Sequence, residues 1–89
     1  MTKSKESLLE FPCRFPIKAM GRNHDDFESV VTEIVLRHAK MFPGEAVATK
    51  ASGEGNFLSV TMTVEAQSQE QLDRIYNDLT ESGRVLMAL

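Results

Sequence analysis

Apolar and polar residues alternate along residues 56–66, and this alternation is the clearest pattern in the chain. From Leu58 to Ala66 every second residue is apolar, and the residues between them are serine, threonine and glutamate. A period of two places one row of side chains on each face of a strand. Threonine and valine also favour a pleated, half-buried surface. The sequence therefore predicts a central strand with one dry face.

A second alternation, at residues 13–20, predicts the first strand of the fold. Pro16 removes one donor from the hydrogen-bond ladder, and Gly21 is expected to end the strand. The inward set is Phe15, Ile17 and Ala19, and the outward set is Arg14, Pro16 and Lys18.

Two segments repeat apolar residues at helical spacing. In the first, Asn23 is the expected N-cap and residues 42–44 are expected to stop the helix. The second predicted helix begins at Ser68, which forms a capping box with Gln71. Gly83 is expected just past the end of this helix. The apolar stripes are Phe27, Val30, Val31, Ile34, Val35 and His38 in the first helix, and Leu72, Ile75, Tyr76 and Leu79 in the second.

Three shorter segments complete the predicted fold. Residues 45–51 indicate an exposed edge strand, because Lys50 discourages pairing with another chain. Residues 52–56 favour a hairpin loop, and residues 84–89 favour a closing strand that is apolar on both sides. The order strand, helix, strand, strand, helix, strand predicts the α+β class: a ferredoxin-like β-α-β-β-α-β sandwich with an antiparallel sheet in the order 4-1-3-2 and both helices on one face. We expect one domain over residues 1–89, with residues 1–7 as a flexible tail.

Charge and cysteine content narrow the class of partner. The net charge is −3, so the surface as a whole repels phosphate backbones, and nucleic-acid binding would need a local basic patch. The single cysteine, Cys13, suits a reducing compartment. The first ten residues lack the apolar run of a signal peptide, and no stretch approaches the ~20 apolar residues of a membrane span. We therefore expect a cytoplasmic protein that has no membrane partner.

The residues that could carry chemistry favour a protein without catalysis. A cysteine nucleophile would need Cys13 beside His24 or His38, but Cys13 is expected to be a small packed hydrophobe and His38 a cation at a helix end. The consecutive side chains of residues 24–26 diverge and cannot converge on one metal ion. The sequence thus predicts no enzyme, no metal and no cofactor. Met20, Met41, Met62 and Met87 are expected to fill gaps in the core.

Two binding sites stay open as alternatives. A glycine beside an arginine at a helix start can hold a carboxylate or phosphate, so Gly21, Arg22 and Asn23 form a candidate site for a small molecule such as an amino acid or organic anion. An acyl-phosphate hydrolase could use such a loop, but it would need a fuller anion cradle. RNA-recognition domains share this element order and place aromatics on central strands, where this chain offers Phe57.

Several segments together resemble the YbeD-like family of small bacterial proteins. They are residues 9–12, Phe15, residues 18–21, residues 37–39, Ser52 and residues 55–61. The resemblance implies the β-α-β-β-α-β fold and similarity to ACT domains, the amino-acid-sensing regulatory modules of metabolic enzymes. In ACT domains the turn after the first strand contacts the effector, and the matching turn here keeps only Gly21 of that pattern.

We expect a non-enzymatic regulatory or adaptor module that binds itself or another protein. The candidate interaction surface consists of Arg14, Lys18, Phe57 and Leu86. A small-molecule sensor at Gly21, Arg22 and Asn23 is the second hypothesis, and RNA binding is the third.

Overall fold

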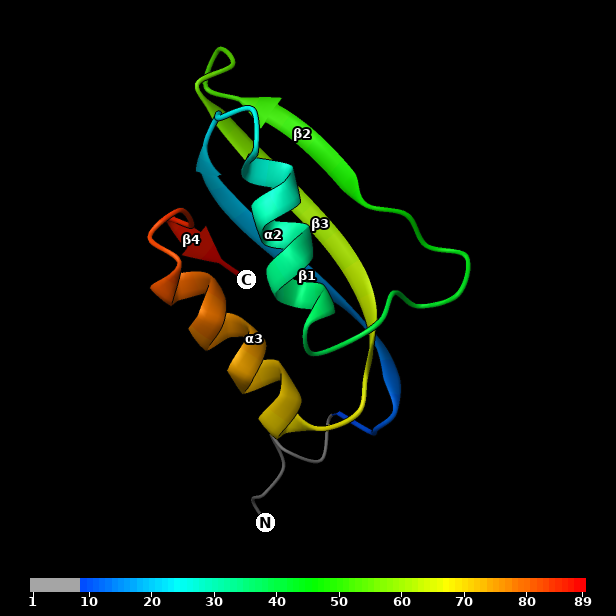
Figure 1. Ribbon diagram of the computed structural model, residues 1–89. Helices are drawn as coiled ribbons and strands as arrows, with labels where there is room; N and C mark the ends of the chain where they lie inside the picture. Colours follow the sequence, from blue (N-terminus) through cyan, green and yellow to red (C-terminus); the bar gives the residue numbers. More distant parts are fainter. Residues whose placement is uncertain (1–8) are drawn as a thin grey trace.

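The structure is a computed structural model that describes residues 9–89, so the predicted tail at residues 1–7 lies outside the described part. Its elements form the expected ferredoxin-like order, and both helices cover the same face of one sheet (Figure 1). The strands are β1 (Cys13–Arg22), β2 (Ala48–Ser52), β3 (Phe57–Ala66) and β4 (Met87–Ala88), and the helices are α2 (Phe27–Leu36) and α3 (Gln69–Glu81).

The sheet order is β2-β3-β1-β4, which is the predicted 4-1-3-2 order read in reverse. All neighbouring strands are antiparallel, and β1 pairs with β3 over its full length, from Cys13 opposite Ala66 to Arg22 opposite Phe57. The two long strands therefore form the centre of the sheet, and β2 and β4 form its edges.

The core lies between the sheet and the two helices. The predicted dry face of β3 is confirmed, because its apolar residues from Val60 onward are buried. The outward residue Thr63 is also buried, at 7% exposure, where residues 40–42 run beside β3. The buried apolar residues are Ile17, Ala19, Phe27, Val31, Ile34, Val35, Val60, Met62, Val64, Ala66, Leu72, Ile75 and Leu79.

Ser68 caps helix α3 as its sequence predicts, but the Gln71 side chain reaches back to Gln67 and not to Ser68, so the capping box is only half formed. Ser68 Oγ accepts a hydrogen bond from the backbone N–H of Gln71 at 3.1 Å, and Gln71 Oε1 accepts one from the backbone N–H of Gln67 at 2.7 Å. The helix ends before Gly83, whose φ of +77° is a conformation that glycine adopts without steric cost.

Other predicted boundaries were wrong. Strand β1 runs through Gly21 to Arg22, and α2 begins after Asp26, so Asn23 is not its N-cap. The helix ends at Leu36, before the expected stop at residues 42–44. The closing strand is shorter than the predicted residues 84–89 and spans Met87–Ala88, because residues 83–85 still lead from α3 to the sheet edge. The chain reaches β1 at Leu86, whose backbone N–H donates to the Met20 carbonyl at 2.7 Å.

Candidate functional site

The face of the sheet turned away from the helices, here called the open face, carries the outward side chains of all four strands. Strand pairing places Arg22 beside Phe57 on this face, and it places Met20 between Met87 and Ser59. The guanidinium carbon of Arg22 lies 5.7 Å from the centroid of the Phe57 ring, a cation–π distance. One end of the open face thus combines aromatic, aliphatic and cationic groups.

A hollow of about 320 Å³ lies at this end of the open face. Its apolar side chains come from β1, the β2–β3 hairpin and β4, elements that Figure 1 shows meeting at one end of the molecule. The residues that line the open-face hollow are Met20, Gly21, Ser52, Gly53, Phe57, Leu86 and Met87.

Glycine at position 21 is required by close packing. A Cβ atom there would lie 2.5 Å from Cε1 of the Phe27 ring and would also meet the Arg84 carbonyl oxygen. Gly21 therefore lets the chain after α3 cross directly over β1. This contact brings Leu86 to the rim of the hollow.

Asn23 secures the chain on the other side of the hollow. Its side-chain amide donates to the Gly55 carbonyl at 2.7 Å, and its backbone N–H donates to the Asn56 carbonyl at 2.9 Å. These bonds tie the end of β1 to the hairpin that carries Phe57. Asn23 thus has a structural role that the N-cap interpretation missed.

The structure brings together residues that the sequence assigned to two separate sites. Gly21, from the predicted ligand turn, and Phe57 and Leu86, from the predicted interaction surface, line the same hollow. Arg14 lies at the other end of β1, where its guanidinium binds Glu45 at 2.5 Å. Lys18 lies between these two ends.

Sequence reasoning missed Met20 and Met87, which it assigned to the core. Met87 is 53% exposed, and Leu86 and Leu89 are each 64% exposed. The Tyr76 hydroxyl donates to the Leu89 carbonyl at 2.8 Å, and burial raises the pKa of this phenol, so it keeps the proton that it donates. The sequence did carry a signal for the exposure of Met87, because apolar side chains follow one another without alternation within residues 84–89.

An ion pair secures the segment that leads to Leu86. Arg84 donates to both carboxylate oxygens of Asp26, at 2.5 and 3.4 Å, and links this segment to the start of α2. The hydrogen bonds from Arg84 lower the pKa of Asp26 below its ordinary value.

We expect Asp26→Asn to reduce stability at neutral pH by a small amount, because the Asp26 side chain is 63% exposed. A carboxyl whose pKa is lowered by folding stabilises the protein above its unfolded pKa, and this contribution is lost as pH falls through the folded pKa. The difference in urea midpoint between wild type and variant should therefore vanish in acid. Asp25→Asn is the matched control, and a difference that persists unchanged to low pH would contradict the assignment.

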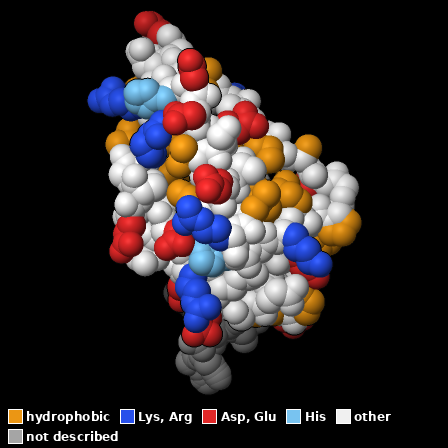
Figure 2. All heavy atoms as spheres, viewed as in Figure 1, with side chains coloured by type: hydrophobic (Ala, Val, Ile, Leu, Met, Phe, Trp, Pro, Cys, Tyr) orange, Lys and Arg blue, Asp and Glu red, His pale blue; other side chains and the backbone are white. Residues whose placement is uncertain are grey.

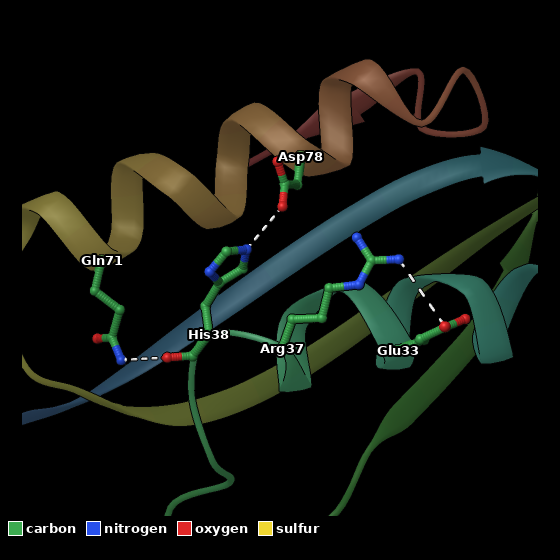
Figure 3. Close-up of polar contacts among 5 residues, drawn as sticks. All are labelled: Glu33, Arg37, His38, Gln71 and Asp78. Carbon is green, nitrogen blue, oxygen red and sulfur yellow. Dashed lines mark hydrogen bonds and ion pairs between the residues drawn. The ribbon is translucent and has the colours of Figure 1, made fainter.

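The groove between α2 and α3 holds a second polar cluster (Figure 3). His38 Nε2 lies 2.7 Å from Asp78 Oδ2, and the Gln71 side chain donates to the His38 carbonyl at 2.8 Å. Nearby, Arg37 lies 3.9 Å from Glu33, the predicted pair along α2. Within residues 9–89, no three His, Cys, Asp or Glu side chains gather as a metal site would require. These contacts hold the end of α2 against α3.

Charged groups of both signs are interspersed over the helical face (Figure 2). Helices α2 and α3 together carry six carboxylates and one arginine. No helix in the described part of the chain has the length and apolar character needed to cross a membrane.

The sheet order and the two helices on one face define a domain with the ferredoxin-like fold. The chain belongs to the family described as "Protein of unknown function (DUF493)", whose model matches residues 6–89. A UPF0250 protein of Chromobacterium violaceum is 45% identical over 89 residues, with all of both chains covered. One from Neisseria meningitidis serogroup C is 42% identical, covering 98% of this chain and 96% of the relative. The resemblance to the YbeD-like family is confirmed, because YbeD is a UPF0250 protein.

Two solved structures are similar in fold. The H. pylori protein HP0495 has a TM-score of 0.75 at 16% identity, covering 100% of this chain and 93% of its own. The ACT domain from the GTP pyrophosphokinase of Chlorobium tepidum has a TM-score of 0.67 at 10% identity, covering 86% of this chain and 97% of its own. At these identities the likeness shows the fold alone.

Proposed function

We propose that this protein is a non-enzymatic regulatory module that works by docking another protein at the open-face hollow. The observation that carries the proposal is the cluster of exposed apolar side chains there. Of the four large hydrophobic residues most exposed in the described chain, Leu86 and Met87 line the hollow, and Leu89 follows β4 beside Lys18. Contiguous exposed apolar surface of this kind is typical of a protein-binding site.

The polar groups outside the hollow support a role without chemistry. The His38 ring is held by Asp78, and Cys13 packs half-buried against the core as a small hydrophobe does. The regulatory part of the proposal rests on the similarity to ACT domains. A cytoplasmic setting is part of the same proposal, and the unpaired thiol of Cys13 suits it.

The hollow also favours a second candidate function, the binding of a small molecule. Its volume of about 320 Å³ is at the lower end of the ~300–1,000 Å³ range of ligand pockets. Arg22 lies over Phe57 at its border and could pair with a carboxylate. An amino acid or organic anion with an apolar side chain would fit this combination.

The test of docking compares two variants that place a charge on different faces. Leu86→Asp puts a carboxylate at the rim of the hollow, and Leu36→Asp puts the same group on α2, where the leucine is 47% exposed. Captured proteins from a lysate of the source bacterium are quantified by mass spectrometry. We expect at least one partner to be retained by wild type and Leu36→Asp and reduced about tenfold or more by Leu86→Asp.

Identical capture by both variants would contradict docking at the hollow.

The second candidate function, small-molecule binding, is tested on the same proteins by two-dimensional amide NMR, with free amino acids and small organic anions added. Shifts confined to residues 20–23 and Phe57, and lost in Arg22→Ala, would support a small-molecule site. An unchanged spectrum would exclude the compounds tested.

A further inference from the structure

The charged residues of the two helices and those of the strands differ in their dominant sign. The helices carry six carboxylates and one arginine, as described above, and the open face has the opposite balance. Outward charged residues of β1, β2 and β3 comprise four cations and one glutamate, and strand pairing places that Glu65 opposite Arg14, at the end away from the hollow. Arg14 also binds Glu45, so the positive charge of the open face is concentrated toward the hollow, in a protein whose net charge is −3.

The other three cations lie next to residues that line the hollow, on β1 and β2. Arg22 lies over Phe57, and Lys18 is the next outward residue along β1 from Met20. Lys50, on the edge strand β2, pairs with Ser59, which itself pairs with Met20. The apolar floor is thus bordered by positive charge on the β1 and β2 sides. Glu54, in the hairpin turn, is the acidic residue nearest to the hollow in sequence.

We propose that the docking partner is a protein segment in which a large apolar side chain is flanked by aspartate or glutamate. The apolar side chain enters the hollow between Met20, Phe57 and Leu86, and the flanking carboxylates pair with Lys18, Arg22 and Lys50. This inference rests on the proposed docking function and names the chemistry of its partner. Complementary charge at the border of an apolar contact adds specificity and speeds association.

The same charges disfavour two other occupants. A second copy bound open face to open face would bring like cations together, which is repulsive. Single-stranded RNA prefers several stacking platforms along a basic groove, and on this face Phe57 is followed along β3 by Ser59, Thr61 and Thr63. An acidic, apolar peptide matches both the charge and the floor of the hollow.

The experiment uses the whole chain and three synthetic peptides of equal length. The first has a central phenylalanine between glutamates, the second has the same phenylalanine between lysines, and the third has glycine between glutamates. Binding is measured by fluorescence anisotropy at low salt, and the contact residues are located by amide NMR. We expect the first peptide to bind about tenfold or more tightly than either other peptide, with affinity falling as salt increases.

Charge reversal supplies the matched control. Lys50→Glu on the exposed edge strand should weaken binding of the glutamate peptide about tenfold and strengthen binding of the lysine peptide. Lys40→Glu should change neither, because Lys40 lies beside Glu65, at the end of β3 away from the hollow. Equal binding of the acidic and basic peptides would overturn the proposal. The proposal would also be overturned if an oligouridine probe bound at the same residues more tightly than the glutamate peptide. It would likewise be overturned if the protein formed a dimer as its concentration increased and the dimer covered the open face.

The two proposals fail separately. If Leu86→Asp abolishes capture of a partner but no peptide binds, docking at the hollow stands and the acidic chemistry of the partner is wrong. If Leu86→Asp also leaves capture unchanged, docking itself is wrong.

Discussion

A Phe27→Ala variant is expected to lose about 3–5 kcal/mol of its free energy of unfolding, the largest effect of any change considered. Phe27 is the first residue of α2, has 0% exposure and touches the strand beneath it at Gly21. Truncation removes the transfer free energy of the ring and leaves a cavity that the surrounding sheet and helix can close only in part. A domain of this size is stable by only ~5–13 kcal/mol, so the variant should be near the limit of folding.

Urea denaturation followed by circular dichroism gives the measurement. Leu36→Ala is the matched control, because Leu36 is at the other end of the same helix and is 47% exposed. Its stability should change by no more than ~0.5–1 kcal/mol. Equal losses from the two variants would mean that Phe27 is not part of the closed core.

A Gly21→Ala variant is expected to lose about 2–3 kcal/mol, in the upper part of the range for overpacking. Gly21 has extended backbone, so on conformational grounds alone alanine would stabilise the protein by ~0.4–1 kcal/mol. The added Cβ, however, meets the ring of Phe27 and the carbonyl of Arg84. Because a carbonyl in the backbone cannot move aside as a side chain can, we expect the steric cost to exceed the gain.

A double-mutant cycle tests this cause. Leucine at position 27 lacks the ring atoms that the Cβ would meet, so Gly21→Ala should cost about 1 kcal/mol less in a Phe27→Leu background. Equal costs in both backgrounds would assign the whole effect to Arg84. A more stable Gly21→Ala protein would contradict the close approach itself.

Much of the fold was predicted from local pattern. The alternation of β3 and the stripe and cap of α3 agree with the structure, and so does the sheet order. The predicted boundaries of helices and strands were wrong where a long-range contact outweighed the local preference of the sequence. Gly21 was expected to end a strand but permits a crossing, and Asn23 was expected to cap a helix but binds the hairpin.

The candidate site was predicted only in part. Phe57 was identified as an aromatic residue on a central strand, and Leu86 because the last strand is apolar on both sides. Gly21 was identified because it lies beside an arginine at a helix start. The sequence did not identify Met20 and Met87 as part of the site, because a methionine in a strand is expected to be a core residue until its neighbours across the sheet are known. Pairing between β1 and β4 then places both on the open face.

The sequence by itself determined the class of the domain, since hydrophobic periodicity, turn residues and element order depend on neighbours within a few positions. It also determined the overall negative charge and the positive character of the outward residues of β1. Only the tertiary structure decided that one hollow gathers residues from β1, the hairpin and β4, with cations at its border. That arrangement depends on the register between strands far apart in the chain and on one close crossing at Gly21, and neither leaves a periodic signal in the sequence.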